Sequence, residues 1–236
     1  MSKDHVIIAS KGWAWSYRLL SKLQALKLED TKFTIAFRNQ DIRVDISEAK
    51  KENARIRIVY FHWSEYITSE FFDNHECITI HTSNLPHGRG GTPIQNQILD
   101  GITQTRVNAL KTVKGVDRGP IYSSKEISLQ GNLSDIWMSI SDATVILIQR
   151  ILAHDIIPIE QSSIELMEFE PYKRLSGAPN PLDSNTLEEV YDKVRMVDAP
   201  GYPNAQIIID GFVLDFTNAR FINNKEVLCN VKIKKY

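Results

Sequence analysis

The sequence predicts an α/β fold in which a mostly parallel sheet carries helices on both faces, followed by a small C-terminal β-rich extension. Two observations support this prediction. Over most of the chain, short apolar runs alternate with stretches whose apolar residues recur at helical spacing, as in a Rossmann-like sheet. Near the C-terminus the pattern changes, because a helical stretch is followed by 207–231, which looks like two or three antiparallel strands.

The N-terminal elements alternate between strand and helix. His5 to Ser10 is a compact apolar run that ends at Lys11-Gly12, and apolar residues at helical spacing follow from Trp13 to Leu26. Further strands are expected at Thr31–Phe37, at Ile56–Phe61 and in the run that ends at His81, with a charged, mixed stretch at 42–55 and a short helix at 66–72.

Polar and aromatic residues follow two of these strands. His62 and Trp63 come directly after the strand at 56–61, and His81 ends the next strand. In parallel sheets, ligands collect outside the carboxyl ends of the strands, near the point where the strand order reverses. We therefore expect His62, Trp63 and His81 to face a common crevice.

The stretch 77–96 carries many reactive side chains. After His81 the chain enters a loop rich in proline and glycine, which favours close approach of a ligand to the backbone. The loop also carries Ser83, Asn84, His87 and Arg89. A helix is expected from Pro93 to Leu99, since proline at the first helical position loses no needed hydrogen bond.

The later elements complete the sheet and add the extension. Strands are expected at 105–112 and 120–127 on either side of a tight turn around Asp117, with helices at 133–154 and 186–196 and a turn between C-terminal strands at Asn223-Asn224. The loop 171–181 is rich in Pro, Gly, Ser and Asn and indicates a boundary. We expect a catalytic domain at 1–175 and a small C-terminal domain at 181–236.

Composition excludes several classes of function. The chain has 28 Lys+Arg against 29 Asp+Glu, a formal net charge of −1, which argues against a nucleic-acid partner. Cys77 and Cys229 lie far apart in apolar runs and are expected as buried free thiols, and no ligand spacing indicates a metal. The longest apolar segment, 143–152, is interrupted by Gln149 and Arg150, so we expect a cytoplasmic protein without a membrane span.

Two separated motifs resemble the folate-dependent formyltransferases. The first is His81-x-Ser83-x-Leu85-Pro86-x-x-Arg89-Gly90-x-x-Pro93, and the second is Val116-Asp117-x-Gly119-x-Ile121. The resemblance covers roughly residues 5 to 155. It implies transfer of a formyl group from the co-substrate N10-formyltetrahydrofolate to an amine, without a metal, by a catalytic Asn, His and Asp.

The resemblance assigns His81 and Asp117 to two of these roles. Histidine suits a proton shuttle from the attacking amine to the departing N10, because its ordinary pKa is near neutrality. Asp117 would orient the imidazole and favour its cationic form. The Asn of the family stands two residues before the His, where this chain has Thr79. Asn84 and Asn96 are nearby alternatives, and we favour Asn96, which would sit about one turn into its helix.

A finer resemblance indicates the acceptor. The run Gly88 to Asn96, with Gly119-Pro120-Ile121-Tyr122 and a distal segment around Arg195, is similar to enzymes of the pseudaminic-acid pathway type that formylate nucleotide-linked amino-deoxy sugars for surface polysaccharides. With the short C-terminal part and the neutral charge, a tRNA acceptor is not expected. The sugar, its amine and its uridine or thymidine carrier stay open, and a homodimer through the apolar C-terminal strands is conceivable.

Binding roles are expected for a second set of residues. For the folate they are His62, Trp63, Arg89, Gly90 and Asp117, and for the sugar nucleotide they are Ser83, Arg195, Tyr202 and Trp13. Structural roles compete with several of these, since Trp13 can pack the helix start, Arg89 can hold its loop, and Arg195 can tie the C-terminal strands to the main domain.

Two other functions compete with formyl transfer. One is a hydrolase of the same folate, in which water replaces the amine and the folate turns over without any acceptor. The other is a catalytically silent binding module, which the threonine at position 79 makes conceivable.

Overall fold

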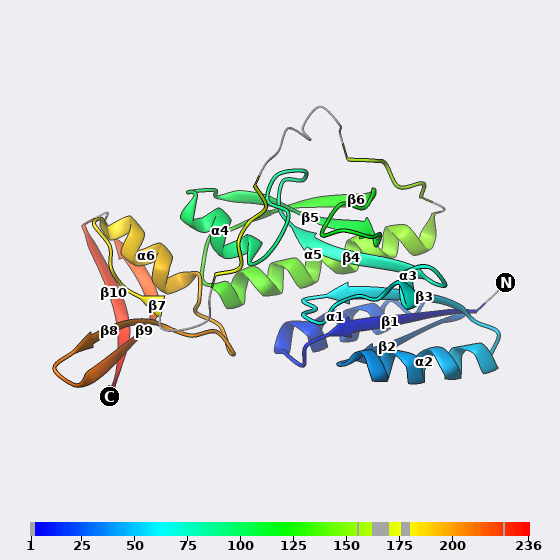
Figure 1. Ribbon diagram of the computed structural model, residues 1–236, viewed down its shortest axis with the longest axis horizontal. Coiled ribbons are helices and arrows are strands. Elements are labelled where there is room, and N and C mark those ends of the chain that lie inside the picture. The colour runs from blue at the N-terminus through cyan, green and yellow to red at the C-terminus, as the bar shows by residue number, and fades with distance from the viewer. Residues whose placement is uncertain (1–2, 155, 162–169, 176–179, 224) are drawn as a thin grey trace. The chain divides into compact units, whose positions relative to one another are not determined.

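The computed structural model of the chain describes residues 3–154, 156–161, 170–175, 180–223 and 225–236 (Figure 1). The elements of the main sheet and its helices are β1 (Asp4–Ser10), α1 (Ala14–Ala25), β2 (Thr31–Ala36), α2 (Asn39–Lys51), β3 (Arg55–Phe61), α3 (Ser69–Phe72), β4 (Glu76–Thr82), α4 (Pro93–Leu99), β5 (Gln104–Lys111), β6 (Ile121–Ser128) and α5 (Leu133–Ala153). The C-terminal elements are β7 (Asn180–Pro181), α6 (Leu187–Arg195), β8 (Ala205–Ile209), β9 (Phe212–Ile222) and β10 (Glu226–Lys235).

The main sheet has the strand order β2-β1-β3-β4-β5-β6. Neighbouring strands from β2 to β4 pair in parallel, and β5 pairs antiparallel to β4. The expected mostly parallel, Rossmann-like sheet is therefore confirmed. Because β1 is flanked by β2 on one side and β3 on the other, the strand order reverses there, and the loops after β1 and β3 meet at that point.

Helices cover both faces of this sheet, as expected. On one face, Ile42, Ile46 and Ala49 of α2 pack in a single cluster with Ile7 of β1 and Ile58 of β3. Side chains alternate between the faces of a strand, so the equally buried neighbours of Ile7 and Ile58 point to the other face. The helices α1 and α5 lie beside each other, joined by ion pairs.

Helix α5 is long and apolar enough by length and composition to cross a membrane, although half of its most apolar window is buried inside the structure. Asp142, in the middle of α5, accepts two hydrogen bonds from Arg18 of α1 at 2.8 and 2.9 Å and one from Lys22 at 2.7 Å. A carboxylate paired with two cations suits a helix that packs against another helix in a folded domain.

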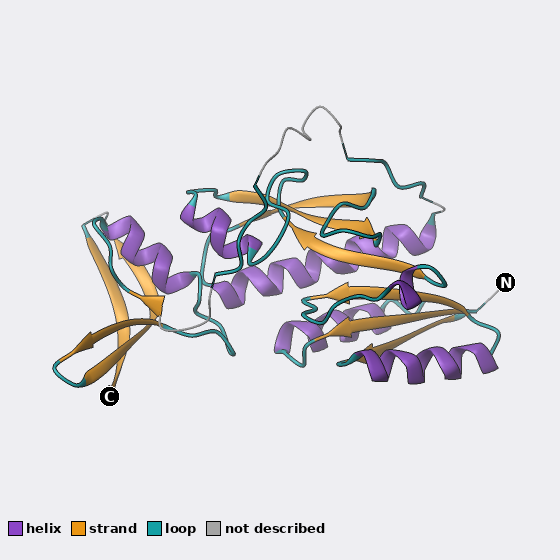
Figure 2. Ribbon diagram, viewed as in Figure 1, coloured by secondary structure: helices purple, strands orange, loops and turns teal. Residues whose placement is uncertain are grey.

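The described chain divides into two compact units. The first comprises 1–89, 106–127 and 138–170, and the second comprises 90–105, 128–137 and 171–236. In the second unit, β10, β9, β8 and β7 form a sheet in that order, with antiparallel pairing except between β7 and β8. This sheet confirms the expected β-rich extension (Figure 2). The domain limits 1–175 and 181–236 remain a prediction.

Several local expectations need refinement. The charged stretch at 42–55 forms most of α2, whose apolar residues recur at helical spacing. The helix expected at 66–72 is limited to Ser69–Phe72. Cys77 is buried and Cys229 is half-buried, and both are free. The expected turn at Asn223-Asn224 includes Asn224, which lies outside the described residues, as do residues 176–179 of the expected boundary loop.

Candidate functional site

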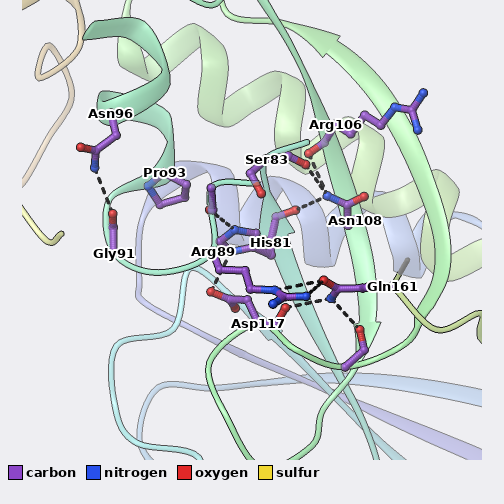
Figure 3. Close-up of polar contacts among 12 residues, drawn as sticks. His81, Ser83, Arg89, Gly91, Pro93, Asn96, Arg106, Asn108, Asp117 and Gln161 are labelled. Atoms are coloured by element: carbon purple, nitrogen blue, oxygen red, sulfur yellow. Dashed lines mark hydrogen bonds and ion pairs between the residues drawn. The ribbon is translucent and has the colours of Figure 1, made fainter. Parts of the chain in front are cut away.

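His81 lies near the carboxyl end of β4, with only 7% of its side chain exposed. Its Nδ1 is 3.3 Å from Oδ2 of Asp117, and its Nε2 is 2.9 Å from the carbonyl oxygen of Gly88 (Figure 3). The two separated sequence motifs therefore meet at one imidazole ring.

Both partners of this ring are hydrogen-bond acceptors. An imidazolium donates to the Asp117 carboxylate and to the Gly88 carbonyl at once, whereas a neutral ring donates to only one of them. The carboxylate thus orients the ring. This arrangement suits a group that takes a proton in one step and returns it in the next.

The Asp117 turn has an unusual backbone. Asp117 has φ +50°, in the left-handed region that non-glycine residues seldom occupy. Gly119 contacts the adjoining strand so closely that a Cβ there would lie 1.7 Å from the carbonyl oxygen of Lys111 in β5. Only glycine fits at position 119, and this close contact fixes one end of the turn against the sheet.

The strand next to His81 supplies a buried amide that sequence reasoning missed. Asn108 of β5 stands opposite His81 in the ladder and is 1% exposed. Its Nδ2 donates to the carbonyl of Ser83 at 2.7 Å, and its Oδ1 accepts from the hydroxyl of Ser124 at 2.6 Å. Asn108 therefore fixes the chain directly after His81. In the local sequence it resembles any polar residue of an alternating strand.

Thr79 lies on the same face of β4 as His81, because side chains two residues apart share a face. Its hydroxyl is 2.8 Å from the hydroxyl of Thr112. Asn84, by contrast, is an exposed loop residue. Ser83 is fully buried, and its Oγ has no hydrogen-bond partner in the described part of the chain.

Asn96 uses its amide group within the second unit. Its Nδ2 donates to the carbonyls of Thr92 at 2.9 Å and Gly91 at 3.1 Å, to the Thr92 hydroxyl at 3.2 Å and to the Lys173 carbonyl at 3.2 Å. These contacts hold the start of α4 and the chain around Lys173 together. An Nδ2 that donated to a reacting oxygen would have to leave them.

Arg89 is held by a residue that sequence reasoning did not single out. Its Nε donates to Oε1 of Gln161 at 3.1 Å, and its Nη2 donates to the same oxygen. Burial, followed by the nearby charge of Arg118, lowers the pKa of Arg89. The expected loop-holding role of Arg89 therefore has a partner in the structure.

Gly90 and Gly91 make room for the protein's own chain. Gly90 has φ +105°, and a Cβ there would lie 2.5 Å from the carbonyl oxygen of Tyr172. At Gly91 a Cβ would lie 2.8 Å from the side chain of Arg174. The expected ligand contact at Gly90 remains a prediction, since in the structure the segment around Tyr172 occupies this side of the loop.

Aromatic side chains gather after β1 and β3, where the strand order reverses. The rings of Trp13 and Trp15 are stacked at a centroid distance of 5.8 Å, and Trp15 Nε1 donates to Nδ1 of His62 at 3.0 Å. Trp63 packs on Tyr60 at 5.9 Å. Trp13, His62 and Trp63, predicted as binding residues, thus lie at the position where ligands of such sheets collect.

Arg195 and Tyr202 have internal partners in the second unit. Arg195 is 5% exposed, and its guanidinium donates to Asp192 and to the carbonyls of Leu129 and Gly131. The hydroxyl of Tyr202 accepts from Trp137 Nε1 at 3.2 Å, and burial raises the pKa of Tyr202 to about 12. For Arg195 these bonds favour the structural alternative over contact with a pyrophosphate.

Comparisons with known proteins find several similar formyltransferases. The sequence-family model for the C-terminal domain of methionyl-tRNA formyltransferase matches residues 178–234. A solved methionyl-tRNA formyltransferase from Clostridium thermocellum is 28% identical, with a TM-score of 0.87 over 99% of this chain and 100% of that one. The chain is therefore similar to methionyl-tRNA formyltransferases in sequence and in fold.

The similar proteins differ in how much of their length is matched. The methionyl-tRNA formyltransferase of Campylobacter lari is 26% identical over 186 residues, which are 74% of this chain and 60% of that protein. The chain thus spans less than two thirds of the length of the first curated relatives. A sugar N-formyltransferase from Shewanella shares the fold, with 19% identity and a TM-score of 0.64 over 91% of this chain and 97% of that one.

The structure brings only some of the predicted residues together. His81, Asp117 and Arg89 form one connected group in the first unit, with Ser83 beside Asn108. Asn96, Arg195 and Tyr202 belong to the second unit. In the described residues, no group of three or more His, Cys, Asp or Glu side chains is arranged to hold a metal ion.

Proposed function

We propose that this formyltransferase moves the formyl group of N10-formyltetrahydrofolate to the primary amine of a nucleotide-linked amino-deoxy sugar. The observation that carries the proposal is the contact between His81 and Asp117. Two motifs some 35 residues apart supply one residue each to an acid–base pair that the sequence resemblance assigns to formyl transfer.

The reaction needs one proton to move while a C–N bond forms and another breaks. The neutral amine attacks the formyl carbon, and the carbonyl oxygen becomes an oxyanion. The amine nitrogen then loses a proton and N10 of the folate gains one as it leaves. His81 can carry this proton, with Asp117 stabilising the imidazolium in between. The reaction requires no redox step and no metal.

The donor site is proposed at the loops that follow β3 and β4. His62 and Trp63 follow β3, and Arg89 and Gly90 stand in the loop after β4. The indole nitrogen of Trp63 is buried and has no hydrogen-bond partner in the described residues, which suits a group that meets a polar ligand. His62 accepts a bond from Trp15 at Nδ1, so Nε2 carries the proton of the neutral ring.

Two residues are candidates for the donor to the oxyanion. Asn96 remains our sequence-based candidate, although its Nδ2 already donates to Gly91, Thr92 and Lys173. Thr79 shares a face with His81 and needs only to turn its hydroxyl away from Thr112. If Asn96→Ala kept near-normal turnover while Thr79→Val abolished it, the oxyanion role would pass to Thr79.

The charge of the chain supports a small acceptor. With 28 Lys+Arg against 29 Asp+Glu, the protein has no excess of cations to neutralise a phosphate backbone. A nucleotide-linked sugar needs only one or two cationic contacts at its pyrophosphate.

Methionyl-tRNA is the second candidate acceptor. The family model that matches residues 178–234 carries this name, and so do the curated relatives described above. The exposed end of β10 also carries Lys232, Lys234 and Lys235, although Lys234 pairs with Asp215.

A panel of acceptors tests the proposal. The purified protein is incubated with N10-formyltetrahydrofolate and, separately, with 3- and 4-amino-sugar nucleotides, with methionyl-tRNA or without an acceptor, and products are identified by mass. We expect one formyl group on a single amino-sugar nucleotide. Formyl-methionyl-tRNA as the only product would establish the second candidate instead.

The same panel distinguishes formyl transfer from folate hydrolysis and from folate binding without catalysis. Release of formate and tetrahydrofolate at the same rate with and without acceptor would identify a hydrolase. Binding of the folate, measured by calorimetry, with no formylated product on any acceptor would identify a silent binding module and overturn the proposed transfer.

A further inference from the structure

Gln161 is one side chain that contacts both sides of the His81 site. Its Nε2 donates to the carbonyl oxygens of Asp117 and Gly119, each at 2.8 Å. Its Oε1 accepts from Arg89, with Nε at 3.1 Å. All of these residues belong to the first unit, and Figure 3 shows Gln161 between Arg89 and the Asp117 turn.

These bonds use the whole hydrogen-bonding capacity of the amide. A glutamine offers two N–H donors and one oxygen with two lone pairs, and each is occupied here. The geometry therefore defines the side-chain orientation uniquely, since exchanging the amide oxygen and nitrogen would set two carbonyls against an oxygen and Arg89 against an N–H.

The bond to Asp117 acts on a strained residue. Asp117 has φ +50°, in the left-handed region that is unfavourable for a residue with a Cβ. Its carbonyl is held by Gln161 while its carboxylate contacts His81 at 3.3 Å. The amide therefore fixes the backbone from which the carboxylate reaches the ring.

The backbone before Gln161 is itself anchored. Ile159 and Ile121 form an antiparallel bridge in which Ile121 N–H donates at 2.7 Å and Ile159 N–H donates at 2.9 Å. Ile121 begins β6, directly after the turn that Gln161 holds. Gln161 is thus attached to the main sheet rather than carried by a free loop.

The bond to Arg89 reaches the other partner of His81. Arg89 follows Gly88, whose carbonyl oxygen is 2.9 Å from His81 Nε2. Contacts therefore connect Gly88 to His81, His81 to Asp117, Asp117 to Gln161, and Gln161 to Arg89. The peptide bond between Gly88 and Arg89 completes this closed set of connections. Loosening Gln161 would release both acceptors that orient the imidazole.

We propose that Gln161 is a positioning residue for the proposed transfer reaction, joining the Asp117 turn to the loop after β4 so that His81 keeps both of its partners. This inference rests on the proposed function. Gln161 touches neither reacting group directly and acts through Asp117 and Arg89.

The test compares three variants of the full-length protein with wild type. Gln161→Met keeps the size of the side chain and removes every hydrogen bond. Gln161→Glu keeps acceptors for Arg89 and removes the donors to the turn. The matched control is Gln24→Met on α1, an exposed glutamine of the same unit that donates to the Phe33 carbonyl at 3.4 Å.

We expect Gln161→Met and Gln161→Glu each to lower kcat about tenfold or more, with the KM for the acceptor changed less than threefold, because misplacing a catalytic group slows the chemical step. Gln24→Met should match wild type. In an Asp117→Asn background, Gln161→Met should lower kcat by a smaller factor than it does in the wild-type background, since part of the effect acts through Asp117. An equal loss in both backgrounds, or a wild-type kcat for Gln161→Glu, would overturn the inference.

A readout without turnover separates this inference from the proposed function. The ring C–H signal of His81 is assigned in NMR spectra with His81→Asn, and its titration midpoint is measured. A midpoint that moves in Gln161→Met and not in Gln24→Met supports positioning even if no acceptor is ever formylated. An unchanged midpoint in Gln161→Met, with the variant folded by circular dichroism, contradicts it.

Discussion

At the scale of single residues, the ring of His81 is defined by what each nitrogen faces. Asp117 stands at Nδ1 and the carbonyl of Gly88 at Nε2, so each ring nitrogen faces a hydrogen-bond acceptor. A proton shuttle must alternate between charged and neutral forms, and a carboxylate at one nitrogen is the usual means of stabilising the charged one.

This pair predicts the effect of removing either member. His81→Asn should lower kcat by about 100-fold or more, because general acid–base catalysis is typically worth that much. Asp117→Asn, which keeps the shape of the side chain and removes its charge, should also lower kcat while the KM for the folate changes little. Both are measured in the formyl transfer assay.

The control for these variants is His87→Asn in the same loop, since His87 is exposed. It should retain wild-type turnover. Near-normal activity of His81→Asn, or an equal loss in His87→Asn, would show that the His81 ring does not carry the proton.

At the scale of elements, α5 is held against α1 by charge as well as by apolar packing. Arg18 is the main cause that lowers the pKa of Asp142 to about 2, with Lys22 contributing further. The side chains of all three residues are about two fifths exposed, so solvent screens the ion pairs. The cluster therefore aligns the helices more than it stabilises the fold.

The depressed pKa of Asp142 predicts how this contribution depends on pH. A carboxyl with a lower pKa in the folded state stabilises the protein fully above its unfolded pKa of about 4, and this stability is lost as the pH falls towards about 2. Asp142→Asn should thus lower the free energy of unfolding at pH 7 by no more than about 1 kcal/mol.

Urea unfolding of wild type and Asp142→Asn between pH 7 and pH 2 measures this difference. It should shrink below pH 4. A difference that is the same at pH 7 and pH 2 would mean that the carboxylate charge is not its source, and Lys32→Ala, a change at an exposed pair elsewhere, serves as a control for general charge effects.

At the scale of the whole molecule, the balance of charge bears on the acceptor. Cations and anions nearly cancel over the 236 residues, so no net attraction draws a nucleic acid to this protein. The proposed acceptor is a nucleotide-linked amino sugar, and methionyl-tRNA is the second candidate. The salt dependence of kcat/KM distinguishes the two acceptors, because its slope increases with the number of phosphates that the protein neutralises.

For the proposed nucleotide-sugar acceptor, kcat/KM should fall less than about tenfold between 50 and 200 mM salt, since only a pyrophosphate is contacted. An acceptor bound through six to ten phosphates would lose a factor of roughly 10³ to 10⁵ over the same range. A steep slope with the amino-sugar nucleotide would contradict binding through its pyrophosphate alone.

Local patterns predicted much of the fold. Apolar runs and helical spacing located β1, β3 and α5 to within a few residues, because these periodicities follow from each element's own geometry. The helix α2 was not assigned, since its charged residues obscured the spacing of Ile42, Ile46 and Ala49. The apolar stripe formed by these three residues becomes apparent only from the burial of one face of the helix in the structure.

What the sequence by itself determined is the position of His81 at a strand end and of Asp117 in a glycine-bounded turn, because motif order and turn chemistry are local. Only the tertiary structure decided which atoms meet. It set Gln161 between Arg89 and Asp117, directed the Asn96 amide to its own loop, and placed Asn108 opposite His81. Hydrogen bonds between residues 25 to 72 positions apart leave no local pattern, since they depend on how the strands and loops pack.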